Sequence, residues 1–401
     1  MDIKSQLGKI KIRTEEIIPE EELVEKLKKS KRENRPLNIK LGIDPTSPDI
    51  HIGHIVAAKK MRDFQDLGHK GIIIIGDFTA QIGDPTGKDK TRQSLNDEQV
   101  KKNAEKYMDQ LYKVLDEEKT EVKWQTSWFD DMTLAKVMKL MSRFTLAKFM
   151  EHDTFRRRYE EGLPLSLHEI LYPILQAYDS IMINADIELG ATEQKFNILT
   201  GRRLQQMMDQ EPQVAILMPI LIGTDGTEKM SKSLDNYIAV FDTPKEKYGK
   251  VMSIPDSVIV NYYKYAAFAS REELKKVKSA LEDKNVNPKK LKMELARKIV
   301  SLYDGEEAAK QAEKEFEKVF AKNKLPKDMP VFTTDQAEMW IVKLVSSTGL
   351  VDSNSEARRM IKQGAVSIDD EKITKINIDQ EIEDGMVLRV GKRRFCKIKK
   401  K

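Results

Sequence analysis

The chain has 401 residues, one cysteine and a formal net charge of +5 at pH 7. Its length suggests two or three domains, and its composition, 40% hydrophobic and 34% charged, describes a soluble globular protein. The sequence has no apolar run near the ~20 residues needed to cross a bilayer, and its N-terminus has no apolar leader. A single cysteine cannot form an intrachain disulfide. We therefore expect a cytoplasmic protein with no membrane partner.

The first informative segment predicts a strand, a loop and a helix. Asn38–Ile43 has the β-branched and apolar character of a strand, and residues 44–49 are rich in turn formers. A helix is expected to begin near His51, with His54 on the same face one turn later. Its free N–H groups and dipole favour a phosphate there, and Gly53 lets a flat base approach the backbone. Alone, such a pair is more often an ordinary helix start, and nothing nearby completes a metal site.

The rest of the first domain predicts a buried parallel sheet. Gly71–Phe78 is nearly continuous in isoleucine, as expected for a strand covered on both faces. A helical insertion is expected at about 96–178. A further buried strand is expected at Val214–Ile222. The fold class expected for residues 1–233 is therefore α/β, with a Rossmann-like parallel-sheet catalytic domain and a helical insertion.

A second short motif follows that last strand. Residues 223–228 contain two glycines and small polar residues, typical of a mobile loop. The pentad Lys229-Met230-Ser231-Lys232-Ser233 comes next. Two ammonium groups on such a loop would offset charge developing on a departing pyrophosphate. Taken alone, the pentad would be read as a solvated charged turn.

The C-terminal part predicts a helical domain and a small α+β domain. Residues 234–321 are charged and helical in pattern, and 322–336, with two prolines, are expected to be a linker. Residues 337–401 predict two helices followed by strands. Cations there suit phosphate contacts of an RNA-binding domain, the alternative being a solvated basic tail. The expected RNA-binding residues are Arg358, Arg359, Lys362, Lys392, Arg393 and Arg394. Cys396 is expected to be a surface or edge-strand thiol.

The paired motifs carry a family resemblance. His51-Ile52-Gly53-His54 and the downstream pentad, in this order, match the signatures of class I aminoacyl-tRNA synthetases. Three further stretches, Leu41–Thr46, Ile82–Lys88 and Leu171–Asp179, resemble the bacterial tyrosyl-tRNA synthetases along nearly the whole chain. The resemblance implies a tyrosine-tRNA ligase that acts on L-tyrosine, tRNA(Tyr) and ATP carried with Mg²⁺, and that forms a homodimer through the insertion.

The resemblance also implies a role for each matching residue. Residues implied for tyrosine binding are Thr79, Asp84, Tyr172 and Gln176 near the ammonium group, Asp179 at the phenol and Gln194 at the carboxylate. Residues implied for ATP binding are Asp44, Thr46, His51, Gly53, His54, Glu193, Lys229, Met230, Lys232 and Ser233. The implied catalytic set is His51, His54, Lys88, Arg92, Lys229 and Lys232.

The chain departs from the family pattern at a few positions. Lys40 stands where many relatives carry a tyrosine that contacts the phenol, and it cannot act as the same neutral donor. Ala191 and Glu193 stand where glycine and aspartate are more usual, and glutamate lengthens the reach toward the ribose. Ala57 replaces a threonine found near the nucleotide in some relatives.

Three alternative functions remain open on the sequence alone. A tryptophan enzyme has a closely related fold, although the Gln176 and Asp179 pattern and the C-terminal segment favour tyrosine. A non-catalytic RNA-binding paralogue would share the fold, but both ATP motifs are intact here. A nucleotidylyltransferase can share the first motif, but such proteins are usually shorter and lack the C-terminal segment.

Overall fold

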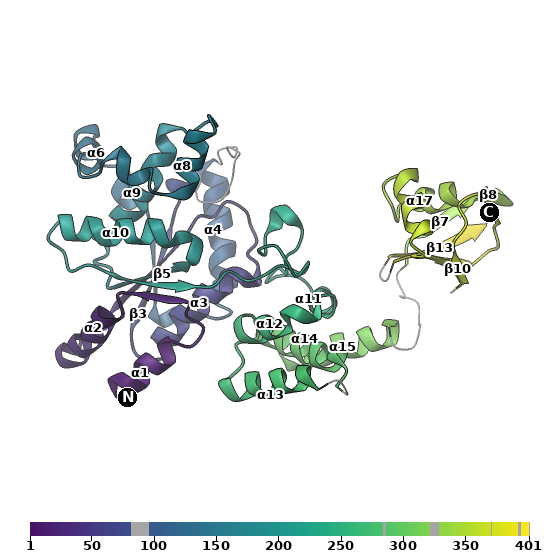
Figure 1. The fold of residues 1–401 in the computed structure, drawn as a ribbon, viewed down its shortest axis with the longest axis horizontal. Coiled ribbons are helices and arrows are strands. Elements are labelled where there is room, and N and C mark those ends of the chain that lie inside the picture. The colour runs from purple at the N-terminus through teal and green to yellow at the C-terminus, as the bar shows by residue number, and fades with distance from the viewer. Residues whose placement is uncertain (82–95, 284–285, 321–328, 370, 392–393, 401) are drawn as a thin grey trace. The chain divides into compact units, whose positions relative to one another are not determined.

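The protein forms two compact units, Met1–Glu313 and Lys314–Lys401, which are described separately. The structure is a computed structural model, and it describes residues 1–81, 96–283, 286–320, 329–369, 371–391 and 394–400 (Figure 1). Among these residues, no helix is both long enough and apolar enough to span a membrane.

A six-stranded sheet forms the centre of the first unit, in the order β1-β6-β5-β2-β3-β4. All neighbours are parallel except β1, which pairs antiparallel with β6. The bounds of the strands are β1 Glu16–Ile18, β2 Asn38–Ile43, β3 Lys70–Ile75, β4 Thr120–Trp124, β5 Ile187–Ala191 and β6 Val214–Met218.

The sequence predictions for these strands differ in accuracy. The strand Asn38–Ile43 is confirmed, whereas the strand expected at Gly71–Phe78 ends at Ile75, and the one expected at Val214–Ile222 ends at Met218. The segment 96–178 is not purely helical, because β4 within it pairs with β3 at the edge of the sheet.

The chain reverses its direction across the sheet between β2 and β5. Helix α3 (Ile52–Gln65) connects β2 to β3, and α10 (Lys195–Met207) connects β5 to β6 in the opposite direction. Right-handed crossovers therefore place α3 and α10 on opposite faces of the sheet, as Figure 1 shows. The carboxyl ends of β2 and β5 meet at a topological switch point, which is where open α/β sheets bind ligands.

The other helices of the catalytic segment cover the sheet and form the insertion. Helix α9 (Leu167–Met182) packs along α10, and its apolar face joins Phe149, Phe155 and Leu204 in one buried cluster. The remaining helices are α1 Ile3–Ile10, α2 Glu20–Glu33, α4 Asp97–Leu111, α5 Thr126–Phe129, α6 Leu134–Met141, α7 Leu146–Phe149 and α8 Asp153–Glu160, with short 3-10 helices η1 Thr79–Gln81, η2 Glu117–Lys119, η3 Thr192–Gln194 and η4 Lys232–Leu234.

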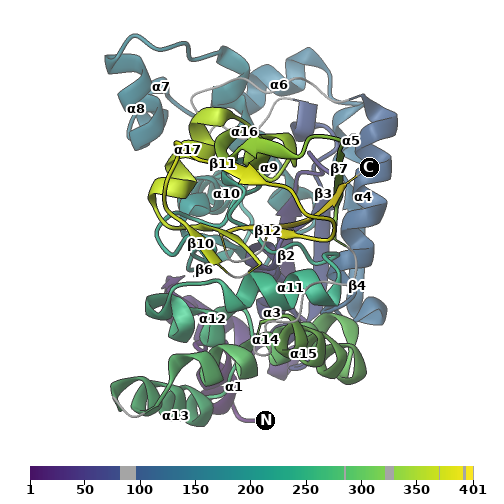
Figure 2. The ribbon, with the colours of Figure 1, turned by 90° about the vertical axis from the view of Figure 1, so that its right-hand side faces the viewer.

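A helical layer completes the first unit. Helix α14 packs against α11 and α12, and the group lies together in both views (Figures 1 and 2). Lys247 on α11 is fully buried, and its ammonium group is paired with Asp304 at 2.7 Å. The helical pattern expected for residues 234–321 is confirmed where the structure describes them. The bounds are α11 Pro244–Met252, η5 Asp256–Val258, α12 Ile259–Tyr265, α13 Arg271–Glu282, α14 Pro288–Asp304 and α15 Glu306–Phe320.

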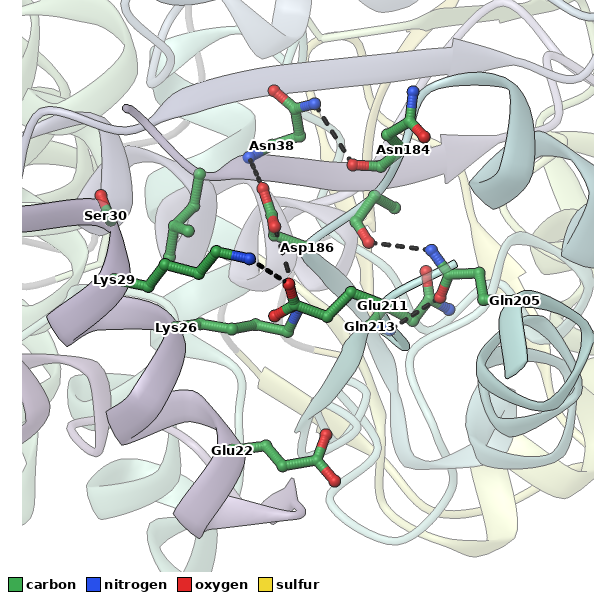
Figure 3. A network of polar contacts seen from close by, with 12 residues as sticks. Glu22, Lys26, Lys29, Ser30, Asn38, Asn184, Asp186, Gln205, Glu211 and Gln213 are labelled. Carbon is green, nitrogen blue, oxygen red and sulfur yellow. Dashed lines mark hydrogen bonds and ion pairs between the residues drawn. The ribbon is translucent and has the colours of Figure 1, made fainter. Parts of the chain in front are cut away.

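A polar network ties α2 to the amino ends of the central strands (Figure 3). Glu211 accepts hydrogen bonds from Lys26 at 2.9 Å and Lys29 at 2.6 Å, and these contacts lower the pKa of its carboxyl to about 2. Asp186, just before β5, accepts from the backbone N–H of Asn38 at 2.8 Å. This end of the sheet is the one opposite the switch point, so the network holds the strands in register without entering a ligand site.

The second unit is a small α+β fold. Its main sheet has the order β10-β9-β12-β13-β7, and α16 and α17 contribute to one hydrophobic core beneath it. The bounds are β7 Val331–Thr334, β8 Glu338–Trp340, α16 Ile341–Ser347, α17 Asn354–Lys362, β9 Val366–Ile368, β10 Glu371–Ile373, β11 Asp379–Glu381, β12 Val387–Val390 and β13 Arg394–Lys400.

Two expectations for this unit need correction. Residues 331–334, assigned to the linker, form β7 and pair in parallel with β13. Cys396 is neither on the surface nor on an edge strand. It is fully buried in β13, between β12 and β7, and burial raises the pKa of its thiol.

Candidate active site

A cavity of about 430 Å³ opens at the switch point of the first unit. The ends of β2 and β5, from Leu41 to Ile43 and from Leu189 to Ala191, form its floor. The predicted ATP and tyrosine residues that the structure describes all line it. They are Asp44, Thr46, His51, Gly53, His54, Thr79, Tyr172, Gln176, Asp179, Glu193, Gln194, Lys229, Met230, Lys232 and Ser233. Asp84, Lys88 and Arg92 lie outside the described residues.

The two histidines stand side by side at the start of α3. His51 is the N-cap residue, and its ring centroid lies 3.8 Å from that of His54. The backbone N–H of His51 donates to Nδ1 of His54 at 3.3 Å, so a neutral His54 ring carries its proton on Nε2. A Cβ on Gly53 would lie 2.9 Å from Nδ1 of His51. Glycine is therefore required for the ring packing as well as for close approach of a ligand.

Both imidazoles are held neutral. Burial, with His54 and Lys232 nearby, lowers the pKa of His51 to about 2. His54 opens onto the cavity, yet removal of water around it and the charge of Lys232 lower its pKa to about 4. At pH 7 these side chains are neutral hydrogen-bonding groups, and among the described residues the positive charge at this end of the cavity comes from Lys229 and Lys232.

The second motif folds over the same end of the cavity. The ammonium group of Lys229 pairs with Glu193 at 2.7 Å. Lys232 Nζ donates to Ser47 Oγ and to the backbone oxygen of Asp49, in the loop before α3. These contacts join the second motif to the loop that leads into the first, although Lys232 and Ser47 are 185 positions apart in the sequence.

Asn236 fixes the shape of the lysine loop. Its side chain donates to the backbone oxygen of Lys229 at 3.0 Å and accepts from the N–H of Ser231 at 2.7 Å. Asn236 is nearly fully buried, so these bonds are shielded from competing water. Sequence reasoning missed this residue, because it lies three positions beyond the pentad and belongs to no motif.

Asp44 connects the two halves of the cavity. One carboxylate oxygen accepts from Tyr172 Oη at 2.8 Å, and the other accepts from Thr79 Oγ1 at 2.8 Å. A Cβ on Gly76 would lie 2.0 Å from that second oxygen, so only glycine leaves room for the contact. Asp44 was expected beside the phosphates, and the structure places it against two residues expected to bind tyrosine.

Asp179 forms the deep end of the cavity. It is buried, and its carboxylate accepts from Gln125 Nε2 at 2.8 Å and from Trp128 Nε1 at 3.2 Å. Burial raises the pKa of Asp179 to about 7, against the lowering effect of Lys40 and Gln125. Gln125 also accepts from the N–H of Thr79 at 3.1 Å. Sequence reasoning missed Gln125, because β4, which it follows, was not recognised as a strand.

Gln176 and Gln194 complete the wall. Gln194 Oε1 accepts from Asn197 Nδ2 at 3.1 Å. Gln176 Nε2 donates to Glu188 Oε1 at 3.1 Å, and its own Oε1 is buried with no hydrogen-bond partner among the described residues. Within the same residues, no group of three or more histidine, cysteine, aspartate or glutamate side chains is arranged to hold a metal ion.

The predicted RNA-binding residues belong to the second unit. Arg358, Arg359 and Lys362 are exposed on α17, and the guanidinium of Arg358 lies 5.2 Å from the ring centroid of Trp340. Arg394 instead donates to the backbone oxygen of Leu350 at 2.6 Å, which gives it a structural contact. Lys392 and Arg393 lie outside the described residues.

Comparison with known proteins identifies the class. Residues 31–321 match the family model described as tRNA synthetases class I (W and Y). The chain therefore belongs to the class I tRNA synthetases of the tryptophan and tyrosine group. Residues 321–398 match a second model, described as the Tyrosine--tRNA ligase SYY-like C-terminal domain.

Two similar curated relatives belong to the tyrosine enzymes of this group. The chain is 48% identical to a tyrosine-tRNA ligase of Moorella thermoacetica, covering 99% of this chain and 96% of that protein. It is 49% identical to one of Carboxydothermus hydrogenoformans, covering 99% of this chain and 98% of that protein. The fold is similar to that in a crystal structure of a tyrosyl-tRNA synthetase from Archaeoglobus fulgidus complexed with L-tyrosine, with a TM-score of 0.62. That match covers 78% of this chain and all of the other chain, at 23% sequence identity, and it supports the fold.

Proposed function

We infer that this protein is a tyrosine-tRNA ligase. It activates L-tyrosine with ATP to give tyrosyl-adenylate and pyrophosphate, and then transfers the tyrosyl group to the 3′ end of tRNA(Tyr). The observation that carries this function is the meeting of both ATP motifs and the described tyrosine-binding set around one cavity. The nearly full-length relatives at 48% and 49% identity support tyrosine as the amino acid.

Activation needs orientation and charge stabilisation rather than a nucleophilic side chain. The tyrosine carboxylate attacks the α-phosphorus of ATP, a new phosphorus–oxygen bond forms, and the bond to the bridging oxygen breaks as pyrophosphate leaves with the electron pair. His54 Nε2 donates to a phosphate oxygen, and the ammonium groups of Lys229 and Lys232 offset the developing charge. ATP enters with Mg²⁺, which leaves with the pyrophosphate.

ATP binding requires the lysine loop to exchange partners. In the structure, Glu193 holds Lys229 at 2.7 Å, and Lys232 is held by the loop before α3. When the nucleotide occupies the cavity, the ribose hydroxyls donate to Glu193 in place of Lys229. The ammonium groups of Lys229 and Lys232 then contact the phosphates. Lysine contacts made mainly once charge develops on pyrophosphate accelerate the chemical step.

Tyrosine recognition uses the deep end of the cavity. The phenol donates to Asp179, and Tyr172, Gln176 and Thr79 lie near the ammonium group. Phenylalanine leaves the buried carboxylate of Asp179 without its ligand partner, which is more costly than a lost contact in water. Tyrosine-dependent pyrophosphate exchange in the absence of tRNA, followed by charging of a tRNA(Tyr) transcript, tests both steps. Exchange without charging would leave the transfer step unsupported.

A homodimer through the insertion is part of the proposal. Large apolar side chains stand exposed on its helices, with Leu167 82% exposed and Leu134 76% exposed. Exposed apolar groups gathered on one segment are typical of an interface. The parent should be dimeric by light scattering, and a Leu134→Asp/Leu167→Asp variant should be monomeric. Leu302→Asp, at an exposed leucine of α14, is the matched control and should stay dimeric. A monomeric parent would contradict the dimer.

The second unit is proposed to bind tRNA through α17, where three cations are exposed on one short helix. Phosphate contacts of this kind give salt-dependent affinity. The cytoplasmic location expected from the sequence is also part of the proposal.

A further inference from the structure

A buried ion pair lies directly behind the amino-acid end of the cavity. Lys40 on β2 and Glu188 on β5 are 0% and 1% exposed, and their charged groups are 2.9 Å apart. Neither residue lines the cavity. A buried charge pair has to be fully hydrogen-bonded to be tolerated, because both groups lose their hydration.

All three hydrogens of the Lys40 ammonium group are engaged. Besides Glu188, it donates to the backbone oxygen of Gln176 at 2.7 Å and to Ser180 Oγ at 2.8 Å. An ammonium group has three donors and no acceptor. Lys40 therefore has no hydrogen left for a phenol, and it does not take over the ligand contact of the tyrosine found at this position in many relatives.

Glu188 is equally saturated, and it sets the orientation of Gln176. Its carboxylate accepts from Lys40 at 2.9 Å, Gln176 Nε2 at 3.1 Å, Ser180 Oγ at 3.3 Å and Gln213 Nε2. Because the amide nitrogen of Gln176 faces a carboxylate, the amide cannot flip without placing two acceptors together. Its Oε1 is buried and has no hydrogen-bond partner among the described residues.

We propose that Lys40 and Glu188 are positioning residues for tyrosine binding, which hold in place the turn of α9 that carries Gln176 and Asp179. Lys40 and Glu188 both form hydrogen bonds with Gln176 at one end of that turn and with Ser180 at the other. The inference rests on the proposed function and adds to it the groups that hold the specificity residues in place.

Three variants test the pair by pyrophosphate exchange with purified full-length protein. Lys40→Met and Glu188→Gln should each raise the KM for tyrosine by about 10- to 100-fold, the range for loss of a charge-assisted hydrogen bond. The KM for ATP should stay within about twofold. The double variant should lose about as much as the worse single variant, because both changes disable one unit.

The double variant also covers the case in which a single variant fails to fold, since it leaves no unpaired buried charge. Lys247→Met is the matched control, because Lys247 is a fully buried lysine paired with Asp304 in the helical layer. It should lower the melting temperature without raising the KM for tyrosine.

The results that would overturn the proposal are distinct from those that would overturn the function. Tyrosine-dependent exchange by the parent tests the function itself. If the parent is active, the proposal is wrong when Glu188→Gln changes the KM for tyrosine by less than twofold. That result would favour the alternative in which Lys40 contacts the phenol itself and Glu188 has no part in tyrosine binding. The proposal is also wrong if the two single effects multiply in the double variant, or if the KM for ATP rises equally.

Discussion

We predict that selection of tyrosine over phenylalanine depends on pH near neutrality, because the phenol is proposed to donate to the carboxyl of Asp179. Burial raises its pKa to about 7, and the charged groups acting on it are Lys40 on β2, which lowers the value, and Glu188 on β5, which raises it. An acid with a raised pKa is neutral below that pH, so Asp179 loses its charge as the pH falls through 7. The neutral form makes a weaker hydrogen bond with the phenol than the carboxylate does.

The size of the effect follows from the titration. Asp179 is about 90% ionised at pH 8 and about 10% ionised at pH 6. If recognition of the phenol depends on the carboxylate, the ratio of kcat/KM for tyrosine to that for phenylalanine should fall about tenfold between these pH values. Phenylalanine shares the ammonium and carboxylate groups of tyrosine, so the ratio cancels the titration of ATP and of the substrate backbone.

The assay is pyrophosphate exchange with both amino acids at saturating ATP from pH 6 to 8.5. The Asp179→Asn variant should give a low ratio that no longer changes with pH. A ratio that stays flat in the parent, or that changes equally in Asp179→Asn, would refute the assignment of Asp179 as the phenol acceptor.

The remaining predictions concern the lysine loop and the second unit. Lys229→Ala or Lys232→Ala should slow adenylate formation by on the order of 10²–10³ with little change in tyrosine affinity; single-turnover kinetics should show this, and a loss in affinity with an unchanged chemical step would contradict it. A chain ending at Phe320 should keep tyrosine-dependent exchange and lose efficient tRNA charging. A chain ending near Asp335 should aggregate more readily, because it keeps β7 without its partner strand β13. Neutralising Arg358, Arg359 and Lys362 together should weaken tRNA binding and flatten its salt dependence; an unchanged salt slope would remove α17 from the RNA contact.

Local sequence patterns were sufficient for the centre of the fold. The apolar and β-branched residues within Asn38–Ile43 predicted β2 to the residue, and the motif after it predicted the start of α3 near His51. These features depend on strand propensity, turn residues and helix capping, all of which are encoded within a few neighbouring positions. In the structure the two motifs meet at one cavity, because the carboxyl ends of parallel strands lie at one edge of the sheet.

Features set by distant partners were missed or incomplete. Thr120–Trp124 carries two charged residues of opposite sign among its five, and it forms a strand by pairing with β3. Because the strand was not predicted, the position of Gln125 directly after it was not predicted either. Val331–Thr334 likewise depends on β13, some sixty residues later. Lys40 carries no local sign of burial, since its partner Glu188 lies 148 positions further along the chain.

Whether this cavity activates tyrosine can be measured with an amino-acid panel in ATP–pyrophosphate exchange. All twenty amino acids would be measured separately with Mg²⁺ and without tRNA. Exchange with L-tyrosine should exceed exchange with every other amino acid, and exchange with phenylalanine and with tryptophan should be far lower. Exchange that is faster with tryptophan than with tyrosine, or no exchange with any amino acid, would contradict this expectation.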